Sequence, residues 1–187
     1  MTMAKFYPVA NAPVRSPDKQ GGVDRALGQL GARPTAADEA YPIRIAVDGT
    51  WFHQGTPIGR PALVRLFSTV LRRDDAGDYW LVTPAERGRI TVEDAPFVAV
   101  ELMDDEPGRL TFRTNVDDGV TAGPDHPIRV AFGADGEPRP YVLVRDRLEA
   151  LIARTVFYQL VERAEERDGV MGVASGGAFF PLVEPAR

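Results

Sequence analysis

The feature that most constrains the fold is the Asp48-Gly49 pair, which stands between two short apolar stretches. Aspartate followed by glycine accepts positive φ at both central positions of a type I′ turn, so the pair predicts a β-hairpin. With two residues at its tip, Val47 pairs with Thr50, and side chains alternate across each strand. One face is then expected to be core, and the other carries a cation, an indole and an imidazole. The core face comprises Ile43, Ile45, Val47, Thr50 and Phe52, and the second face comprises Arg44, Ala46, Trp51 and His53.

A helix and three strands are expected after the hairpin. Pro61 suits the first position of a helix, where its missing N–H has no intrahelical partner to lose. The apolar residues that follow recur at i, i+3, i+4, i+7 and i+8, which is typical of a helix with one buried face. They are Leu63, Leu66, Phe67, Val70 and Leu71. Strands are expected over residues 79–83, 89–92 and 97–102, with Pro84 and Pro96 as breaks between them.

The second half of the chain resembles the first when the sequence is shifted by 85 residues. The shift places residues 43–47 on residues 128–132, and it places Arg60 on Arg145. Apolar periodicity alone produces part of such a match, whereas the matched arginines are harder to explain by periodicity. The match predicts an internal duplication, with a long second helix from Asp146 to Arg167 and a closing strand over residues 178–183.

These patterns together predict an α+β fold of two small domains, each built as hairpin, helix and returning antiparallel strands. Residues 1–21 combine prolines and scattered charges without periodicity, which predicts a mobile N-terminal arm. A short amphipathic helix is expected near residues 23–30. The first domain is expected over residues 22–103, and the second, with the long helix, over residues 104–187.

Composition excludes several classes of function. The chain of 187 residues has no cysteine and two histidines, so it cannot form disulfides or thiol nucleophiles and has few ligands for a histidine-based metal site. The net charge of −5 gives no global basic field, which makes nucleic acid an unlikely partner. No apolar run approaches the ~20 residues of a membrane span. We therefore expect a cytoplasmic protein without a membrane contact, metal or cofactor.

No residue pattern in the chain spells out catalysis. His53 is the first candidate for a general base, yet a histidine on a strand beside Trp51 is more often a half-buried surface residue. His126 lies in an expected turn, and no serine stands in a G-x-S-x-G elbow. The acidic runs 104–106 and 117–118 lack the spacing of a calcium loop. An enzyme is therefore the third-ranked reading.

Ligand binding has better support in the sequence. Arg60 and Arg145 each precede an expected helix, where a guanidinium suits phosphate or carboxylate binding, although a pair with a neighbouring acid is the more ordinary use. Trp51 offers a surface on which a base could stack, although a strand aromatic is usually core.

The stretch from Ile45 to Val100 resembles a family of proteobacterial proteins that is classed as a domain of unknown function. The residues that carry the resemblance are the runs 48–53, 56–58 and 63–67 with Arg60, and the runs 79–84 and 92–97 with Glu86. The resemblance implies a duplicated α+β core in two domains, the second superficially like a pleckstrin-homology fold. It also implies a ligand site at the domain interface that suits a nucleotide-like molecule, and a role in signal transduction.

Two readings of function follow. In the first, the protein is a sensor that binds a small anionic, nucleotide-like ligand between its two halves, without catalysis. Its expected ligand-binding residues are Arg44, Arg60 and Arg65 for charge, Trp51 for stacking, and His53, Thr83 and Glu86 for polar contacts. In the second, the chain is a protein-interaction module without a small ligand, and the Trp51 face and the mobile N-terminal arm dock a protein partner.

Overall fold

The computed structural model describes residue 25 and residues 39–103, 106–133 and 136–183. The expected N-terminal arm lies outside these residues, and so does the expected helix near residues 23–30, apart from Arg25, which is helical. In the described part of the chain, no helix is long and apolar enough to cross a membrane.

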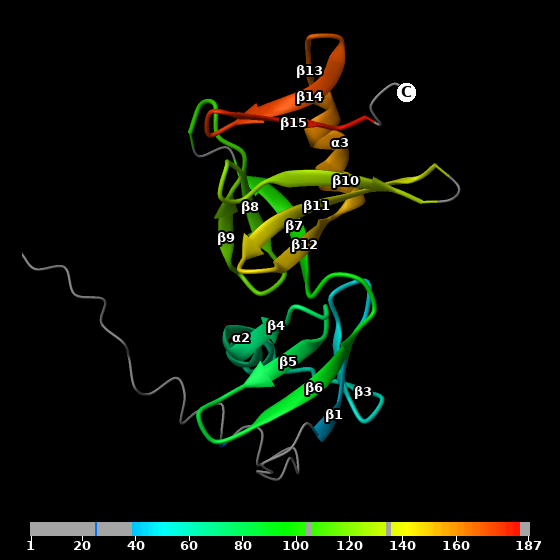
Figure 1. The fold of residues 1–187 in the computed structure, drawn as a ribbon, viewed down its shortest axis with the longest axis vertical. Coiled ribbons are helices and arrows are strands. Elements are labelled where there is room, and N and C mark those ends of the chain that lie inside the picture. Colours follow the sequence, from blue (N-terminus) through cyan, green and yellow to red (C-terminus); the bar gives the residue numbers. More distant parts are fainter. Residues whose placement is uncertain (1–24, 26–38, 104–105, 134–135, 184–187) are drawn as a thin grey trace, which may run out of the picture.

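Strands dominate the described residues, and they form two six-stranded sheets that stand one above the other (Figure 1). The first sheet has the order β3-β2-β1-β6-β5-β4, and its strands are β1 (Glu39–Ile45), β2 (Trp51–His53), β3 (Thr56–Pro57), β4 (Leu71–Arg73), β5 (Tyr79–Val82) and β6 (Arg87–Val92). Helix α2 (Pro61–Val70) lies between β3 and β4 in the chain. These elements form the first domain.

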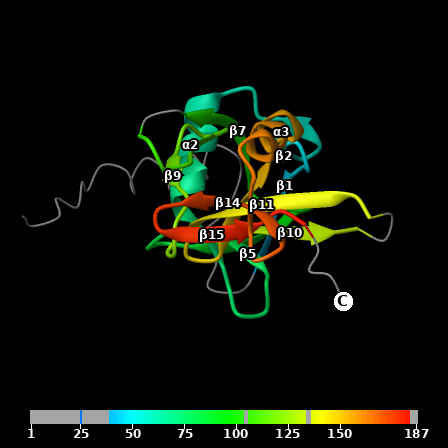
Figure 2. The same cartoon turned by 90° about the horizontal axis from the view of Figure 1, so that it is seen from above.

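The second domain contains the other six-stranded sheet, of order β10-β11-β12-β7-β8-β9. Its strands are β7 (Phe97–Met103), β8 (Thr111–Thr114), β9 (Gly119–Thr121), β10 (Ile128–Phe132), β11 (Pro138–Arg145) and β12 (Leu148–Ile152). Helix α3 (Arg154–Glu162) follows β12, and a three-stranded sheet of β13 (Glu165–Arg167), β14 (Val170–Ser175) and β15 (Ala178–Pro181) ends the described chain. This small sheet lies at the end of the molecule farthest from the first domain (Figures 1 and 2).

The two large sheets share one topology. Each consists of two antiparallel three-stranded meanders, and the first strand of the first meander runs parallel to the last strand of the second. β1 thus pairs with β6, and β7 pairs with β12, at the centre of each sheet. This arrangement is consistent with the expected duplicated two-domain fold, in a mostly β form.

The 85-residue shift from which the sequence predicted the duplication aligned strands that are not equivalent in the two sheets. The 85-residue shift placed β1 on β10, but β1 is central in its sheet whereas β10 is an edge strand. The topology instead makes β1 equivalent to β7, and β4 equivalent to β10. Strands with alternating apolar residues resemble one another, so periodicity alone did not identify the equivalent strands.

The long helix expected from Asp146 to Arg167 was also wrong. Asp146 has a φ of 47° in a tight turn between β11 and β12, and the strand begins two residues later, at Leu148. In β12 the side chains of Leu148, Ala150 and Ile152 are fully or almost fully buried, which is the period of a strand. The helix that follows, α3, has nine residues. A short apolar run is compatible with the period of a helix and with that of a strand. Here the run forms a strand because it pairs with β7 and β11.

The hairpin at Asp48-Gly49 is present, but its register differs by one residue from the expected one. The carbonyl of Ala46 accepts a hydrogen bond from the N–H of Gly49, and Gly49 has a φ of 80°. This is a type I turn followed by a left-handed glycine, which adds one residue to the loop. Trp51 therefore pairs with Ile45, and the whole second strand is turned over. Trp51 lies in the core, and Phe52 shares the outer face with Arg44.

The strand expected over residues 97–102 is present as β7, but it does not lie in the first domain, where it was expected. β7 pairs with β8 and β12, so it belongs to the second sheet. The change from one sheet to the other falls between β6 and β7, ahead of the boundary expected after residue 103. The other two expected strands are β5 and β6, and the closing strand is β15.

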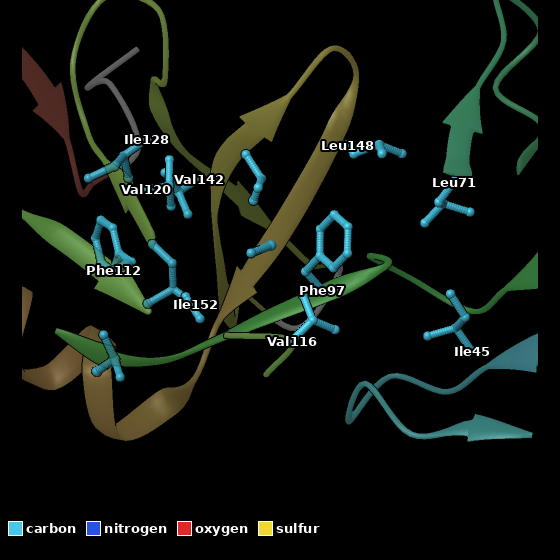
Figure 3. Close-up of a cluster of buried hydrophobic side chains, with 14 of the residues drawn as sticks. Ile45, Leu71, Phe97, Phe112, Val116, Val120, Ile128, Val142, Leu148 and Ile152 are labelled. Carbon is cyan, nitrogen blue, oxygen red and sulfur yellow. The ribbon is translucent and has the colours of Figure 1, made fainter. Parts of the chain in front are cut away.

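One continuous cluster of buried apolar side chains runs through both domains. Figure 3 shows Phe97 and Leu148 of the second domain next to Leu71 and Ile45 of the first. In the first domain Trp51 stacks on Phe67 of α2, with ring centroids 6.1 Å apart. The shared core holds the domains together through burial of apolar surface.

Candidate functional site

The residues that the sequence nominated for ligand binding do not come together. Trp51 is 1% exposed and packs on α2, so its place in the core contradicts the expected stacking face. Arg44 lies on the outer face of β1, where it pairs with Glu93 and lies 4.1 Å above the Phe52 ring. His53 is half-buried at the end of β2. The Trp51 side chain is therefore not available to a protein partner.

Thr83 and Glu86 lie together at the turn between β5 and β6, and Thr83 serves that turn. Its hydroxyl donates to the carbonyl of Glu86 at 3.2 Å and accepts from the N–H groups of Ala85 and Glu86. The Glu86 side chain is buried, and its Oε2 has no hydrogen-bond partner among the described residues. These two residues shape a turn at a distance from the nominated arginines of α2.

Arg60 and Arg65 belong to the region of α2 but have different surroundings. Arg60 is the N-cap of α2, and its exposed guanidinium has no ion pair within the described residues. Arg65 forms an ion pair with Asp117 of the second domain. The carboxylate of Asp117 also accepts from Arg113 at 3.1 Å, so the charge of Arg65 is shared in an exposed network.

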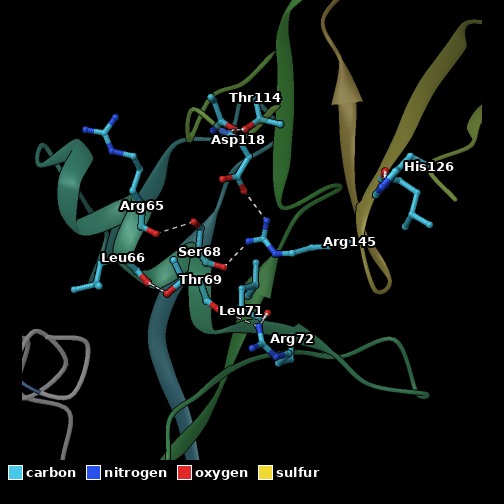
Figure 4. Close-up of polar contacts among 12 residues, drawn as sticks. Arg65, Leu66, Ser68, Thr69, Leu71, Arg72, Thr114, Asp118, His126 and Arg145 are labelled. Atoms are coloured by element: carbon cyan, nitrogen blue, oxygen red, sulfur yellow. Dashed lines mark hydrogen bonds and ion pairs between the residues drawn. The ribbon is translucent and has the colours of Figure 1, made fainter. Parts of the chain in front are cut away.

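Arg145 joins the two domains instead of preceding a helix. Its guanidinium donates to Asp118 at 2.5 Å and to the carbonyl of Ser68 in α2 at 2.7 Å (Figure 4). It also lies 4.9 Å above the Phe97 ring. Both terminal amino groups of Arg145 are thus engaged, which makes it an interdomain clamp and leaves little capacity for a ligand.

A second contact on the same side of the molecule ties the hairpin turn to the second domain. The Asn115 side chain donates to the carbonyl of Gly49 at 3.1 Å and accepts from the N–H of Val98 at 3.0 Å. A Cβ atom on Gly49 would approach the Asn115 amide nitrogen to 2.4 Å. Glycine is therefore required here for the close approach as well as for its positive φ.

The opposite side of the domain junction carries a group of charged and aromatic side chains, which we call the junction cluster. It draws from β4 and β5 of the first domain, from the connection between the domains, and from β10, β11 and β12 of the second. Its members are Arg73, Tyr79, Asp94, Arg129, Arg139, Tyr141 and Glu149.

Asp94 stands at the centre of the junction cluster. One carboxylate oxygen accepts from the Tyr141 hydroxyl at 2.8 Å, and the other accepts from the Arg139 guanidinium at 3.1 Å. Burial, followed by the hydrogen bond to Asp94, raises the pKa of Tyr141 to about 12. Tyr141 therefore remains a neutral donor at physiological pH.

Arg129 makes a two-pronged contact beside this group. Its Nε and one terminal nitrogen each donate to Glu149 at 2.6 Å, and the guanidinium lies 4.2 Å above the Tyr141 ring. The hydrogen bond to Glu149 raises the pKa of Arg129. About half of the Arg129 side chain is still exposed, so the outer edge of the guanidinium is open to solvent.

Tyr79 and Arg73 bring the first domain into the cluster. The Arg73 guanidinium lies 5.2 Å from the centre of the Tyr79 ring, and its Nε donates to the Gly77 carbonyl at 3.4 Å. Burial raises the pKa of Tyr79, the charge of Arg73 lowers it, and the charge of Glu149 raises it. Charges of the second domain thus act on a tyrosine of the first.

A groove of about 350 Å³ opens beside Tyr79. Its lining includes Tyr41, Asp78, Tyr79, Arg89 and Thr91. Arg89 pairs with Asp78 at 3.2 Å, whereas Arg73 at the Tyr79 ring has no ion pair in the described part of the chain. The groove therefore offers concave space with an aromatic wall, and a cation without an ion pair among the described residues contacts two of its lining residues, Gly77 and Tyr79.

The sequence nominated none of these arginines and tyrosines as site residues. The alternation of Arg139 with Tyr141 along β11 was a usable signal. The members lie far apart in the chain, so the topology had to bring them together. Among the described residues, no group of three or more acidic or histidine side chains could hold a metal ion.

Comparison with known proteins identifies the two domains. Residues 33–95 match the model described as "Domain of unknown function (DUF1285), N-terminal domain", and residues 96–182 match "Protein of unknown function (DUF1285), C-terminal domain". No curated protein matches the chain.

Two solved structures are similar. The crystal structure of a DUF1285 family protein from Silicibacter pomeroyi DSS-3 is 46% identical, with a TM-score of 0.76 over 86% of this chain and 95% of that chain. The crystal structure of a DUF1285 family protein from Shewanella baltica OS155 is 25% identical, with a TM-score of 0.53 over 65% of this chain and 91% of that chain. The chain therefore belongs to the DUF1285 family, as the resemblance in its sequence implied.

Proposed function

We propose that this protein is a sensor that binds a small anionic, nucleotide-like ligand at the junction cluster, between its two domains. The observation that carries the proposal is the position of Arg73. It is a cation without a carboxylate partner among the described residues, and it contacts Tyr79 and Gly77, which both line the groove.

The charges around the groove favour an anion with several oxygens. Arg129 and Arg139 reach the cluster from the second domain with about half of each side chain exposed. Guanidinium forks recognise phosphate and carboxylate groups through paired hydrogen bonds. With Arg73, three arginines and two carboxylates leave the cluster with a net positive charge, which suits a phosphate group.

The aromatic side of the groove suits the base of a nucleotide. Tyr79 is half-buried and lines the groove, so a planar base would stack against its ring while the phosphate faces the arginines. A groove of about 350 Å³ lies within the usual size range of small-molecule sites.

The position of the cluster suits a signalling role. Asp94 belongs to the connection between β6 and β7, and its partners belong to β11. An anion that binds Arg139 would compete with Asp94 for this guanidinium. The connection between β6 and β7 would then lose one of its contacts with β11. Ligand binding would then be coupled to the relation between the domains.

A thermal-shift screen tests the proposal. Purified wild-type protein is heated with AMP, GTP, cyclic dinucleotides, ribose and inorganic pyrophosphate, because a ligand of the folded state raises the melting temperature by mass action. Arg73→Gln and Arg129→Gln should each abolish most of a dose-dependent rise. Arg109→Gln is the matched control, since Arg109 is an exposed arginine that pairs with Glu106 away from the cluster.

The outcomes separate the two readings of function. A rise with nucleotides that persists in Arg109→Gln but is lost in both cluster variants supports the sensor. No rise with any probe at millimolar concentration, or equal rises in all variants, contradicts it and favours a protein partner. The melting temperature without ligand shows whether each variant is folded.

A further inference from the structure

A second groove, of about 430 Å³, lies in the second domain between α3 and β11. Its lining is mostly apolar and includes Pro138, Pro140, Ile152 and Phe157. Arg154 and Tyr158, both on α3, line the same groove. Arg139, a member of the junction cluster, also lines this groove, but no residue lines both this groove and the groove beside Tyr79.

Arg154 is held in a particular orientation at the groove. Its Nε donates to the Tyr158 hydroxyl at 2.8 Å, and the guanidinium lies 5.8 Å from the centre of the Tyr158 ring. Arg154 forms no ion pair with the described residues, although most other arginines on the second domain's surface pair with an acid. Because Nε is engaged, the two terminal amino groups remain available as a fork.

The surroundings of this fork are unusual for a surface cation. Tyr158 is 52% exposed and Val161, one turn farther along α3, is 48% exposed. An apolar wall thus continues from the groove along the helix on the side of Arg154. A cation beside apolar surface matches a ligand that has an anionic head and an apolar body.

We propose that this groove binds an amphipathic carboxylate, such as a medium-chain fatty acid. The carboxylate accepts two hydrogen bonds from the terminal amino groups of Arg154, and the chain lies against Pro138, Pro140 and Phe157. Glu137, at the same groove, disfavours ligands with several negative charges and so favours a monocarboxylate over a phosphate ester.

Titration calorimetry with decanoate tests the site in the intact chain. Decanol and decylamine, which share the apolar body, serve as neutral and cationic probes. We expect decanoate to bind at a ratio of one to one, and the other two at least tenfold more weakly. Arg154→Gln should weaken decanoate at least tenfold, because a charge-assisted two-pronged contact is lost.

Two further variants define the geometry. Tyr158→Phe keeps the ring but frees Nε of Arg154, and a severalfold loss of affinity is expected from the less ordered fork. Ala153→Leu fills the groove from its lining and should abolish binding while the protein stays folded. Arg109→Gln is the matched control and should bind decanoate as the wild type does.

A variant at Arg129 also separates this site from the groove beside Tyr79. Arg129→Gln should leave decanoate binding unchanged, whatever it does to nucleotides. Absence of decanoate binding to the wild type, equal affinity for decanol, or unchanged affinity in Arg154→Gln would each overturn the proposal. None of these results bears on whether a nucleotide binds beside Tyr79.

Discussion

At the scale of single residues, glycines and tyrosines at the domain junction have the most specific surroundings. Gly49 and Gly55 have almost the same positive φ, 80° and 79°. They differ in what surrounds them, because a Cβ on Gly49 would meet Asn115 of the second domain whereas a Cβ on Gly55 would meet open space. This pair separates the cost of backbone strain from the cost of a lost interdomain contact.

Gly49→Ala should lower the free energy of unfolding by about 2–4 kcal/mol, since the strain of positive φ adds to a steric conflict. Gly55→Ala should lower it by about 1–2 kcal/mol, from strain alone. Urea denaturation of both variants measures the difference. Equal losses would show that the Asn115 contact contributes nothing to stability.

Tyr141 makes the stability of the protein depend on alkaline pH. Its pKa in the folded state is about 12, above the ordinary 10.0, so its contribution to stability is complete below about pH 10. That contribution is lost as the pH rises from about 10 through about 12, because the unfolded state releases the proton first. In thermal melts, the melting temperature of Tyr141→Phe should fall less between about pH 10 and about pH 12 than that of the wild type. A variant with the same alkaline profile as the wild type would contradict the assignment.

At the scale of elements, β12 shows how one stretch satisfies two patterns. Leu148, Leu151 and Ile152 lie on one stripe of a helix, yet Leu148 and Ile152 lie on one face of a strand and Leu151 on the other. The structure buries Ile152 to 2% exposure and leaves Leu151 half-buried. The parallel partner β7 is what fixes the strand form.

Truncation of these two neighbours distinguishes the strand from a helix. Ile152→Ala should cost about 2–5 kcal/mol, because it leaves a cavity in the core. Leu151→Ala should cost only about 1 kcal/mol, as is usual away from the core. Guanidinium unfolding of both variants gives the comparison. Similar large losses would indicate that both side chains face the core, as in the helix.

At the scale of the whole molecule, two neighbouring acids, Glu93 and Asp94, fix the connection between the domains by binding to a different domain each. Glu93 pairs with Arg44 and accepts from the Val47 N–H, both in the first domain. Asp94 binds Arg139 and Tyr141 of the second. Together with the Arg145 clamp, these contacts fasten the domains on two sides of the shared core.

Loss of the Asp94 contacts together with the Arg145 clamp should weaken the coupling between the domains. We expect calorimetry of the wild type to give one unfolding transition, and Asp94→Asn combined with Arg145→Gln to broaden or split it. Glu106→Gln, which removes an ion pair inside the second domain, is the control and should keep a single transition. A single sharp transition in the double variant would show that the apolar core alone couples the domains.

The local order of elements was determined by the sequence to a large extent. Local patterns predicted β1, β5, β6 and β15, and Pro61 with its apolar stripe predicted α2. The family resemblance in residues 45–100 was equally readable, because it depends on motifs and not on distant contacts. The absence of cysteine excluded disulfides outright.

The tertiary structure alone decided register, partners and the candidate site. One extra loop residue at Gly49 sent Trp51 inward, although the Asp48-Gly49 pair is compatible with either turn. β7 joined the second sheet, although nothing in its own residues distinguishes one edge from another. The junction cluster combines residues from position 73 to position 149, and only the pairing of distant strands brings them together. Local patterns determine which segments form elements, whereas long-range packing determines which elements meet.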